Sequence, residues 1–159
     1  MLIRAAIPAD LPALLALDRA APTAAHWIEA EYQRLFVADT GRVTLVIEED
    51  YVRGFIIGRD LGSEWEIENV VVAEATRHRG MGERLVGEML ALARSRGAQA
   101  VFLEVRESNG PARALYSKWG FIESGRRNSY YKNPEEDALL YKKFVAAETG
   151  KAVEEGRGL

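Results

Sequence analysis

Residues 70–82 read VVVAEATRHRGMG, and this stretch decides the fold. The valines at its start end a run that favours a β-strand, and Gly80 and Gly82 stand where an amphipathic helix begins. Free N–H groups and the helix dipole at such a start attract anions, and glycine lets a ligand approach the backbone closely. Positive charge near the glycines comes from Arg77, Arg79 and Arg84. The stretch therefore predicts a site for a phosphate-containing ligand.

The glycine spacing narrows the kind of phosphate site. A P-loop needs the pattern G-x-x-x-x-G-K-[ST], and the segment has neither that spacing nor the lysine. A Rossmann fingerprint needs a third glycine near Leu85, which is absent. The alternative without function is an ordinary turn between a strand and a helix, because two spaced glycines alone are weak grounds for a ligand site.

The segments on either side alternate between strand and helix patterns. Apolar residues at helical spacing predict helices over 8–20, 24–38, from the glycines to about 96, and over 109–119. Branched and alternating runs predict strands over 2–5, 43–48, 51–59, 65–72, 100–105, 121–131 and 137–144. Thr23 is the expected N-cap of the second helix, Glu49-Asp50 an expected hairpin turn, and Gly97 the expected end of the third helix. The predicted order is β-α-α-β-β-β-α-β-α-β-β.

Composition excludes several classes of function. The chain has 159 residues and a formal charge of −3, which favours one domain and argues against a general nucleic-acid binder. It has no cysteine and two histidines, so cysteine-zinc sites, thiol nucleophiles and multi-histidine metal centres are excluded. The first residues carry Asp10 and Asp18 and lack a long apolar run. We expect a soluble cytoplasmic protein without a membrane span, with a polar, flexible tail over residues 146–159.

Two ordered motifs resemble those of the GNAT acyltransferases. The pattern R-x-x-G-x-G from Arg77 to Gly82 is similar to the acetyl-CoA signature of that family. A second family pattern, N-x-x-A-x-x-L-Y-x-x-x-G-F, is matched by Asn109, Ala112, Leu115, Tyr116, Gly120 and Phe121. The resemblance implies an α/β (α+β) fold over residues 1–145, with a mixed, mostly antiparallel sheet of about seven strands and about four flanking helices. It also implies acetyl-CoA as co-substrate and no metal.

Three further patterns resemble the ribosomal-protein-alanine N-acetyltransferase (RimI-type) subfamily. They are L-E-V-R at 103–106, G-x-R-x-x-Y-Y at 125–131 and E-D-A at 136–138. This resemblance implies acetylation of a protein N-terminal α-amine, with a ribosomal protein as the namesake substrate. The chain departs from the subfamily at Ala73-Glu74-Ala75, where Asp-Pro is usual, and at His26, where proline often precedes the tryptophan. The second departure puts the acceptor specificity in question.

Glu104 is the candidate base. It lies in the run VFLEV, where alternation places it on the face opposite Val101, Leu103 and Val105. Partial desolvation in a central strand should raise the pKa of its carboxyl group, and the subfamily resemblance assigns this glutamate the role of proton acceptor. The alternative is a glutamate paired with a cation on an adjacent strand.

Tyr116 is the candidate acid. A phenol can donate a proton to the leaving thiolate, and family members place this tyrosine near the sulfur of CoA. The alternative is a core aromatic residue with a satisfied hydroxyl group.

The resemblance also implies how acetyl-CoA binds. The backbone of Val70, Val71 and Val72 would pair with the pantetheine arm, and Asn109 would hydrogen-bond it. The pyrophosphate would be held by the amides of Arg77, His78, Arg79, Gly80, Met81 and Gly82. An ordinary sheet strand and a helix N-cap are the alternatives for the valines and for Asn109.

The candidate residues for binding the acceptor are Trp27, Tyr130 and Tyr131. The resemblance implies that the loops carrying these residues line the slot for the acceptor peptide. Trp27 could equally be core, and one of the two tyrosines should face the slot while the other faces the core. A basic peptide could be attracted by Glu66, Glu68, Glu135 and Glu136, unless these are simply solvated charges. The rival functions are a GNAT enzyme for a lysine or small-molecule amine, and a non-catalytic acetyl-CoA-binding module.

Overall fold

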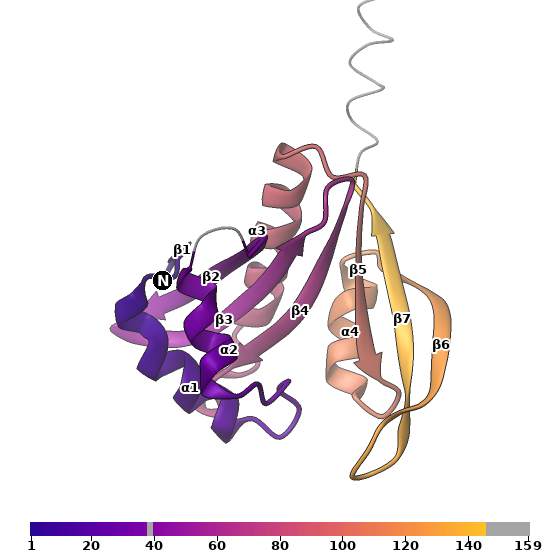
Figure 1. The fold of residues 1–159 in the computed structure, drawn as a ribbon, viewed down its shortest axis with the longest axis horizontal. Coiled ribbons are helices and arrows are strands. Elements are labelled where there is room, and N and C mark those ends of the chain that lie inside the picture. Colours follow the sequence, from indigo (N-terminus) through magenta and orange to yellow (C-terminus); the bar gives the residue numbers. More distant parts are fainter. Residues whose placement is uncertain (38–39, 146–159) are drawn as a thin grey trace, which may run out of the picture. The chain divides into compact units, whose positions relative to one another are not determined.

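The computed structural model describes residues 1–37 and 40–145. The chain divides into two compact units, one made of Met1–Asp60 and Ile67–Met89 and the other of Leu61–Glu66 and Leu90–Leu159. The predicted flexible tail lies outside the described residues. Across the described residues the strands follow the order β1-β2-β3-β4-β5-β7-β6 in one seven-stranded sheet, which confirms the predicted fold class (Figure 1).

The first unit joins an antiparallel sheet to two helices. Its elements are β1 (Leu2–Ala5), α1 (Leu11–Ala20), α2 (Glu29–Gln33), β2 (Arg42–Glu49), β3 (Tyr51–Asp60), most of β4 (Glu64–Val72) and the start of α3 (Met81–Ser95). Short 3-10 turns stand at Pro8–Asp10, Arg34–Phe36 and Glu74–Thr76. β2 pairs antiparallel with both β1 and β3, and the turn between β2 and β3 lies where it was predicted.

Apolar residues of α1, α2, β2, β3 and β4, with Ala21 after α1, form a core cluster of the first unit. The buried cluster contains Leu14, Ala21, Tyr32, Val46, Phe55, Ile57 and Val71. β4 alternates strictly between buried and partly exposed residues from Glu64 to Val72, because successive side chains of a strand point to opposite faces. The last residues of β4 therefore hold one valine in the core and leave its two neighbours partly accessible.

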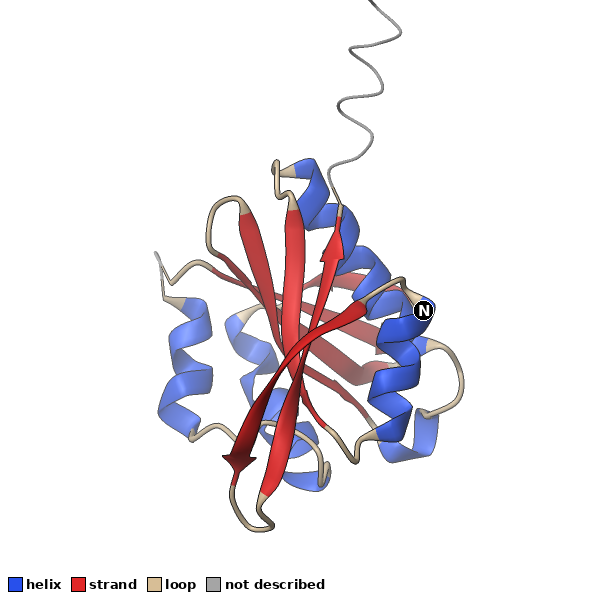
Figure 2. Ribbon diagram, turned by 90° about the vertical axis from the view of Figure 1, so that its right-hand side faces the viewer, coloured by secondary structure: helices blue, strands red, loops and turns tan. Residues whose placement is uncertain are grey.

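The second unit is a three-stranded sheet with a helix. It contains β5 (Ala100–Arg106), α4 (Gly110–Lys118), β6 (Ile122–Tyr131) and β7 (Glu136–Phe144). β7 lies between β5 and β6 and is antiparallel to both. The β6–β7 register shifts between Glu123 and Gly125 and again between Arg127 and Tyr131, and the two strands twist about each other toward their connecting hairpin (Figure 2).

The predicted helix over 24–38 is wrong. Only α2 and one 3-10 turn form there, Ile28 rather than Thr23 caps α2, and Ala38 lies outside the described residues. Ile28 is 69% exposed, and His26 has the left-handed φ of 54°. The cause is tertiary, because the backbone N–H of Ala25 and the ring of His26 bind side chains of other elements instead of continuing a helix.

The remaining helices and all seven strands agree with the sequence analysis to within a few residues. Gly97 has a φ of 86° directly after α3, as expected of a residue that ends a helix. Within the described part of the chain, no helix is both long enough and apolar enough to cross a bilayer.

Candidate functional site

The loop between β4 and α3 has the backbone of an anion site. His78 and Gly80 adopt left-handed φ values of 66° and 77°, and a side chain added at Gly80 would meet no atom within 4 Å. The amide of Arg84 donates to the carbonyl of Gly80 at 3.0 Å, which is the helical bond expected at the first turn. The amides of Met81 and Gly82 therefore have no partner within the helix. The side chain of Met81 is buried and anchors this turn.

The arginines of the loop are not equally available. Arg79 makes two hydrogen bonds of 3.0 Å to the carboxylate of Glu49, and this contact holds the pKa of Glu49 below its usual range. Arg77 is exposed, and its Nε donates to the carbonyl of Val72 at 3.4 Å. Arg84 is exposed on the first turn of α3. Arg77 and Arg84 are thus exposed, whereas Arg79 is bound to the carboxylate of Glu49.

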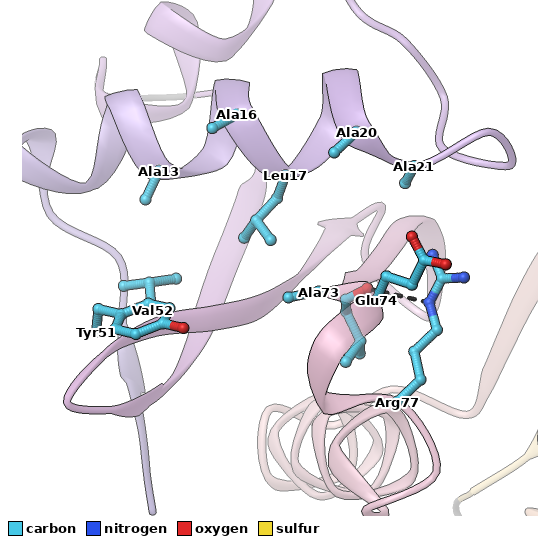
Figure 3. Close-up of a pocket in the computed structure, with 11 residues that line it drawn as sticks. Ala13, Ala16, Leu17, Ala20, Ala21, Tyr51, Val52, Ala73, Glu74 and Arg77 are labelled. Atoms are coloured by element: carbon cyan, nitrogen blue, oxygen red, sulfur yellow. Dashed lines mark hydrogen bonds between the residues drawn. The ribbon is translucent and has the colours of Figure 1, made fainter.

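A cavity of about 300 Å³ adjoins this loop (Figure 3). Small side chains of α1 form one wall, and residues of β3 and the end of β4 form another, with Glu74 and Arg77 at the side of the loop. The lining residues are Ala13, Ala16, Leu17, Ala20, Ala21, Tyr51, Val52, Val72, Ala73, Glu74 and Arg77. Only Val72 and Arg77 of these were predicted as site residues, because the cavity depends on how α1 lies over the strands.

The end of β4, whose backbone was predicted to pair with pantetheine, alternates between buried and partly exposed side chains. Val71 is buried, whereas Val70 and Val72 are partly exposed. The amide of Ala73 donates to the carbonyl of Arg53 at 2.7 Å, so the strand is held against β3 to its last residue. A Cβ atom at Gly54 would lie 2.8 Å from the carbonyl oxygen of Val71, and glycine at that position permits this close approach.

Asn109 is the N-cap of α4. Its Oδ1 accepts a hydrogen bond of 3.2 Å from the amide of Ala112, so the structural alternative for this residue is present. The side chain is only partly exposed, and its Nδ2 is not used by the cap. The cap leaves Nδ2 for another partner, and its contact with pantetheine stays a prediction.

Glu104 is in an ion pair, as the alternative reading expected. Its side chain is 17% exposed, and its Oε1 lies 3.0 Å from the Nε of Arg127. Arg127 comes from β6 and reaches past β7, so the partner is not on an adjacent strand. The side chain of Arg127 is 56% exposed, so the pair opens toward solvent on one side. Because Glu104 points away from the buried face of β5, its carboxylate remains accessible to a substrate.

Tyr116 is buried in the second unit, with its ring packed edge-on against Phe121 and Tyr141. Among the described residues, no hydrogen bond to its hydroxyl group is found. Burial raises the pKa of Tyr116, and nearby Tyr131 raises it further, so the phenol keeps its proton at neutral pH. Tyr116 is thus packed as a core aromatic residue would be. Within the part of the chain that the structure describes, however, its hydroxyl group lacks the hydrogen bond that was expected of a purely structural tyrosine.

Tyr131 interacts electrostatically with both candidate catalytic residues, Glu104 and Tyr116. Burial and the charge of Glu104 raise its pKa, while Arg106 lowers it, and Tyr131 in turn raises the pKa of Tyr116. Its ring lies 4.1 Å from the guanidinium of Arg106 and 5.1 Å from the ring of Tyr130. The second unit thus brings the candidate acid, the candidate base and both candidate acceptor tyrosines into one cluster.

The two candidate acceptor tyrosines differ in exposure, but the predicted opposite orientation of their side chains is wrong, because their rings lie only 5.1 Å apart. The left-handed φ of 50° at Ser129 and the register shift between Arg127 and Tyr131 break the alternation here. Tyr130 is 50% exposed and Tyr131 is half-buried. In the first unit, Trp27 is also half-buried, with its ring 5.4 Å from that of Tyr32 and the guanidinium of Arg42 4.7 Å above it. Trp27 therefore both packs on the core and presents an accessible edge.

Two of the acidic residues suggested for a basic peptide have partners inside the protein. The carboxylate of Glu68 is bound by Arg42 at 2.9 Å, with both side chains mostly buried. Glu136 accepts from the backbone amide of Ser108 and from Arg106, and these contacts lower its pKa. Glu135 is exposed at the hairpin. The attraction of a basic peptide by these residues is accordingly weaker than the sequence suggests.

The sequence analysis missed several polar residues of the site. Arg127 could not be identified as the partner of Glu104, because the contact crosses an intervening strand. Asn69 carried a signal that was not used, since an asparagine before three valines in a buried strand needs hydrogen-bond partners. His26, noted in the sequence only as a departure from the subfamily pattern, contacts the buried carboxylate of Asp18.

The fold is that of known N-acetyltransferase structures. The structure superimposes on that of the ribosomal-protein-S18-alanine N-acetyltransferase from Escherichia coli with a TM-score of 0.81 and 25% identity, covering 91% of this chain and 94% of the other. The sequence profile of the acetyltransferase (GNAT) family matches residues 11–121. The chain belongs to the GNAT family, which confirms the resemblance found in its motifs.

Relatives of known name resemble the chain over different lengths. The [ribosomal protein bS18]-alanine N-acetyltransferase of Salmonella typhimurium is 31% identical over 136 residues, which cover 82% of this chain and 88% of the relative. The enzyme of the same name from Haemophilus influenzae is 36% identical over 89 residues, covering 56% of this chain and 60% of the relative. In two further relatives the chain spans 21% and 64% of their length.

Proposed function

We propose that the protein transfers an acetyl group from acetyl-CoA directly to the N-terminal α-amine of a cytoplasmic protein, with a ribosomal protein as the acceptor. The observation that carries this proposal is the cluster of Glu104, Tyr131 and Tyr116, which joins a carboxylate to a protonated phenol. The names of the Salmonella and Haemophilus relatives support the choice of a ribosomal protein.

The loop from Arg77 to Gly82 suits the phosphates of CoA. It offers unpaired amides at the start of α3, an open position at Gly80 and the exposed guanidinium of Arg77. The backbone of Val70 to Val72 would hold the pantetheine arm, with the free amide group of Asn109 as a further donor. When bound, acetyl-CoA supplies an acyl group activated as a thioester.

The reaction needs a neutral amine. An α-amine has a pKa of about 7.7–8.0, far below the value of about 10.4 for lysine, so a carboxylate base is sufficient. Glu104 takes the proton from the ammonium group, directly or through a water molecule. The amine nitrogen then forms a bond to the thioester carbonyl carbon. This role requires that the incoming ammonium group replace Arg127 as the cation next to Glu104.

Departure of the thiolate completes the transfer. The bond between the carbonyl carbon and sulfur breaks, and the sulfur takes the proton of the Tyr116 hydroxyl group. The nitrogen loses its second proton through water to the resulting phenolate, which restores Tyr116, and Glu104 releases the first proton to solvent. Burial keeps this phenol protonated, so the proton is in place before the acceptor arrives. Since the chain has no cysteine, an acyl-cysteine intermediate is impossible, which agrees with direct transfer.

A panel of three peptides tests the acceptor class. The peptides carry a free α-amine without lysine, a blocked α-amine with an internal lysine, or both amines blocked, and mass spectrometry locates the added acetyl group. We expect acetylation of the first peptide alone. Acetylation of only the lysine peptide would show that the acceptor is a lysine and not an α-amine. Binding of acetyl-CoA without any transfer would favour a non-catalytic module.

A further inference from the structure

A buried chain of polar side chains connects β4 to the loop between α1 and α2, residues 21–28. The Nδ2 atom of Asn69 donates to the hydroxyl group of Tyr32 at 3.1 Å, and that hydroxyl donates to Oδ2 of Asp18. Asn69, Tyr32 and Asp18 are 7%, 0% and 2% exposed. These three residues come from three elements, α1, α2 and β4, and lie together within the first unit.

Two polar contacts attach the loop to this network, one from a backbone amide and one from a histidine ring. The amide of Ala25 donates to Oδ1 of Asn69 at 3.4 Å, and Nδ1 of His26 lies 3.0 Å from Oδ1 of Asp18. Each oxygen of the Asp18 carboxylate therefore has a partner, one on α2 and one on the loop. His26 makes its contact with a left-handed φ of 54°, a conformation that costs energy in a residue with a side chain.

The network explains how the carboxylate of Asp18 is kept in the core. A buried carboxylate is tolerated only when hydrogen bonds replace the water it has lost. Burial raises the pKa of Tyr32, and the neighbouring Asp18 raises it further, so the hydroxyl group stays protonated and donates to the carboxylate. Because these hydrogen bonds are directional, they select one position of the loop, which apolar packing alone would do less strictly.

Both ends of the network meet residues of the proposed substrate site. Asn69 directly precedes the three valines of the proposed cofactor strand. The loop carries Trp27, whose ring lies 5.4 Å from the ring of Tyr32. A shift of the loop would therefore move the accessible edge of Trp27 while β4 stays in place, held by β3.

We infer that Asp18, Tyr32, Asn69 and His26 are positioning residues for the acceptor, which hold Trp27 and its loop at a set place relative to the cofactor strand. This inference rests on the proposed function. None of the four residues needs to touch the reacting atoms, and their effect should appear in the binding of the peptide rather than in the binding of acetyl-CoA.

The most informative variant is His26→Ala, because the side chain is 50% exposed, so its loss removes the partner of Asp18 Oδ1 while the apolar packing of the core is unchanged. We expect the KM for the acceptor peptide to rise about 10-fold or more, since small misplacements of a positioning group have large effects. The Kd for acetyl-CoA should change less than about 2-fold, because the loop from Arg77 to Gly82 is untouched. His26→Asn should restore most of the loss, since asparagine tolerates a left-handed φ and its amide can donate to Asp18.

Tyr32→Phe tests the hub of the network, and Thr23→Ala is the matched control. Tyr32→Phe removes one hydroxyl group and leaves the ring contacts in place, and we expect it to raise the peptide KM as His26→Ala does. Thr23 is an exposed residue of the same loop, so its substitution should leave every measured constant unchanged. Thermal unfolding of each variant separates loss of stability from loss of peptide affinity.

Hydrogen exchange of residues 22–28 without substrate gives a second readout that needs no activity. The inference predicts faster exchange of the Ala25 amide in His26→Ala and Tyr32→Phe, and wild-type exchange in Thr23→Ala. Unchanged exchange and an unchanged peptide KM in both variants would overturn it. A parallel rise of the peptide KM and the acetyl-CoA Kd would also overturn it, because that is the result of general destabilisation. A wild-type protein that acetylates no peptide refutes the proposed function, while the exchange result still decides whether the network holds the loop.

Discussion

Tyr116→Phe separates a catalytic phenol from a core aromatic residue, because it removes one oxygen atom and preserves the ring. The ring contacts with Phe121 and Tyr141, at centroid distances of 5.6 and 6.4 Å, do not involve the hydroxyl group. No hydrogen bond to this hydroxyl is found among the described residues. The substitution therefore leaves no buried donor or acceptor unpaired.

The expected sizes of the two effects differ widely. Loss of a general acid lowers kcat by about 10²–10⁴-fold, which is about 3–5 kcal/mol of transition-state stabilisation. Loss of an unpaired hydroxyl group should change the free energy of unfolding by less than about 1 kcal/mol. For a chain of this length, that corresponds to a shift in Tm of less than about 4 °C.

Release of free thiol from acetyl-CoA in the presence of an α-amine peptide measures kcat, and calorimetry measures Tm. Tyr141→Phe is the matched control, since Tyr141 is equally buried but its hydroxyl group accepts a hydrogen bond of 3.1 Å from Arg113. The control should lose about 1 kcal/mol of stability and keep its activity. Normal turnover by Tyr116→Phe would refute the assignment of the acid, whatever its Tm.

Four other substitutions test the base, the phosphate loop and the stability in acid. Glu104→Gln should lower kcat by about 10²–10⁴-fold with acetyl-CoA affinity, measured by calorimetry, within about 2-fold of wild type; an unchanged rate removes Glu104 from the mechanism. Glu49→Gln frees Arg79 and should tighten acetyl-CoA binding up to about 5-fold at low salt, whereas Arg79→Ala should weaken it, and equal effects of both would contradict the shared-arginine geometry. Asp10→Asn should cost about 1–3 kcal/mol at pH 7 in urea unfolding, because Arg4 holds the pKa of Asp10 below its usual value. Since a lowered folded pKa gives stability above the unfolded value of about 3.9, the difference from wild type should disappear as the pH falls through the folded pKa; a constant difference down to pH 3 would exclude this linkage.

The sequence alone determined the class of fold and the candidates for each chemical role. Strand and helix periods are local properties, so the order of elements and the start of α3 at the glycines could be predicted without tertiary information. The motifs around Glu104 and Tyr116 likewise depend on short-range spacing. The core packing of Tyr116 was one of the alternatives that the local pattern offered, whereas the contact between the rings of Tyr130 and Tyr131 was not.

Tertiary structure decided what those side chains contact. The pairing of Glu104 with Arg127 arises because the chain returns through β6 and β7, and no local pattern records which residues such a return brings together. The segment around His26 has the composition of a helix, yet it becomes a loop because Asn69 and Asp18 offer its polar groups better partners than a helical turn would. Local propensities differ by less than a kcal/mol per residue, so a few buried hydrogen bonds from distant elements are enough to override them.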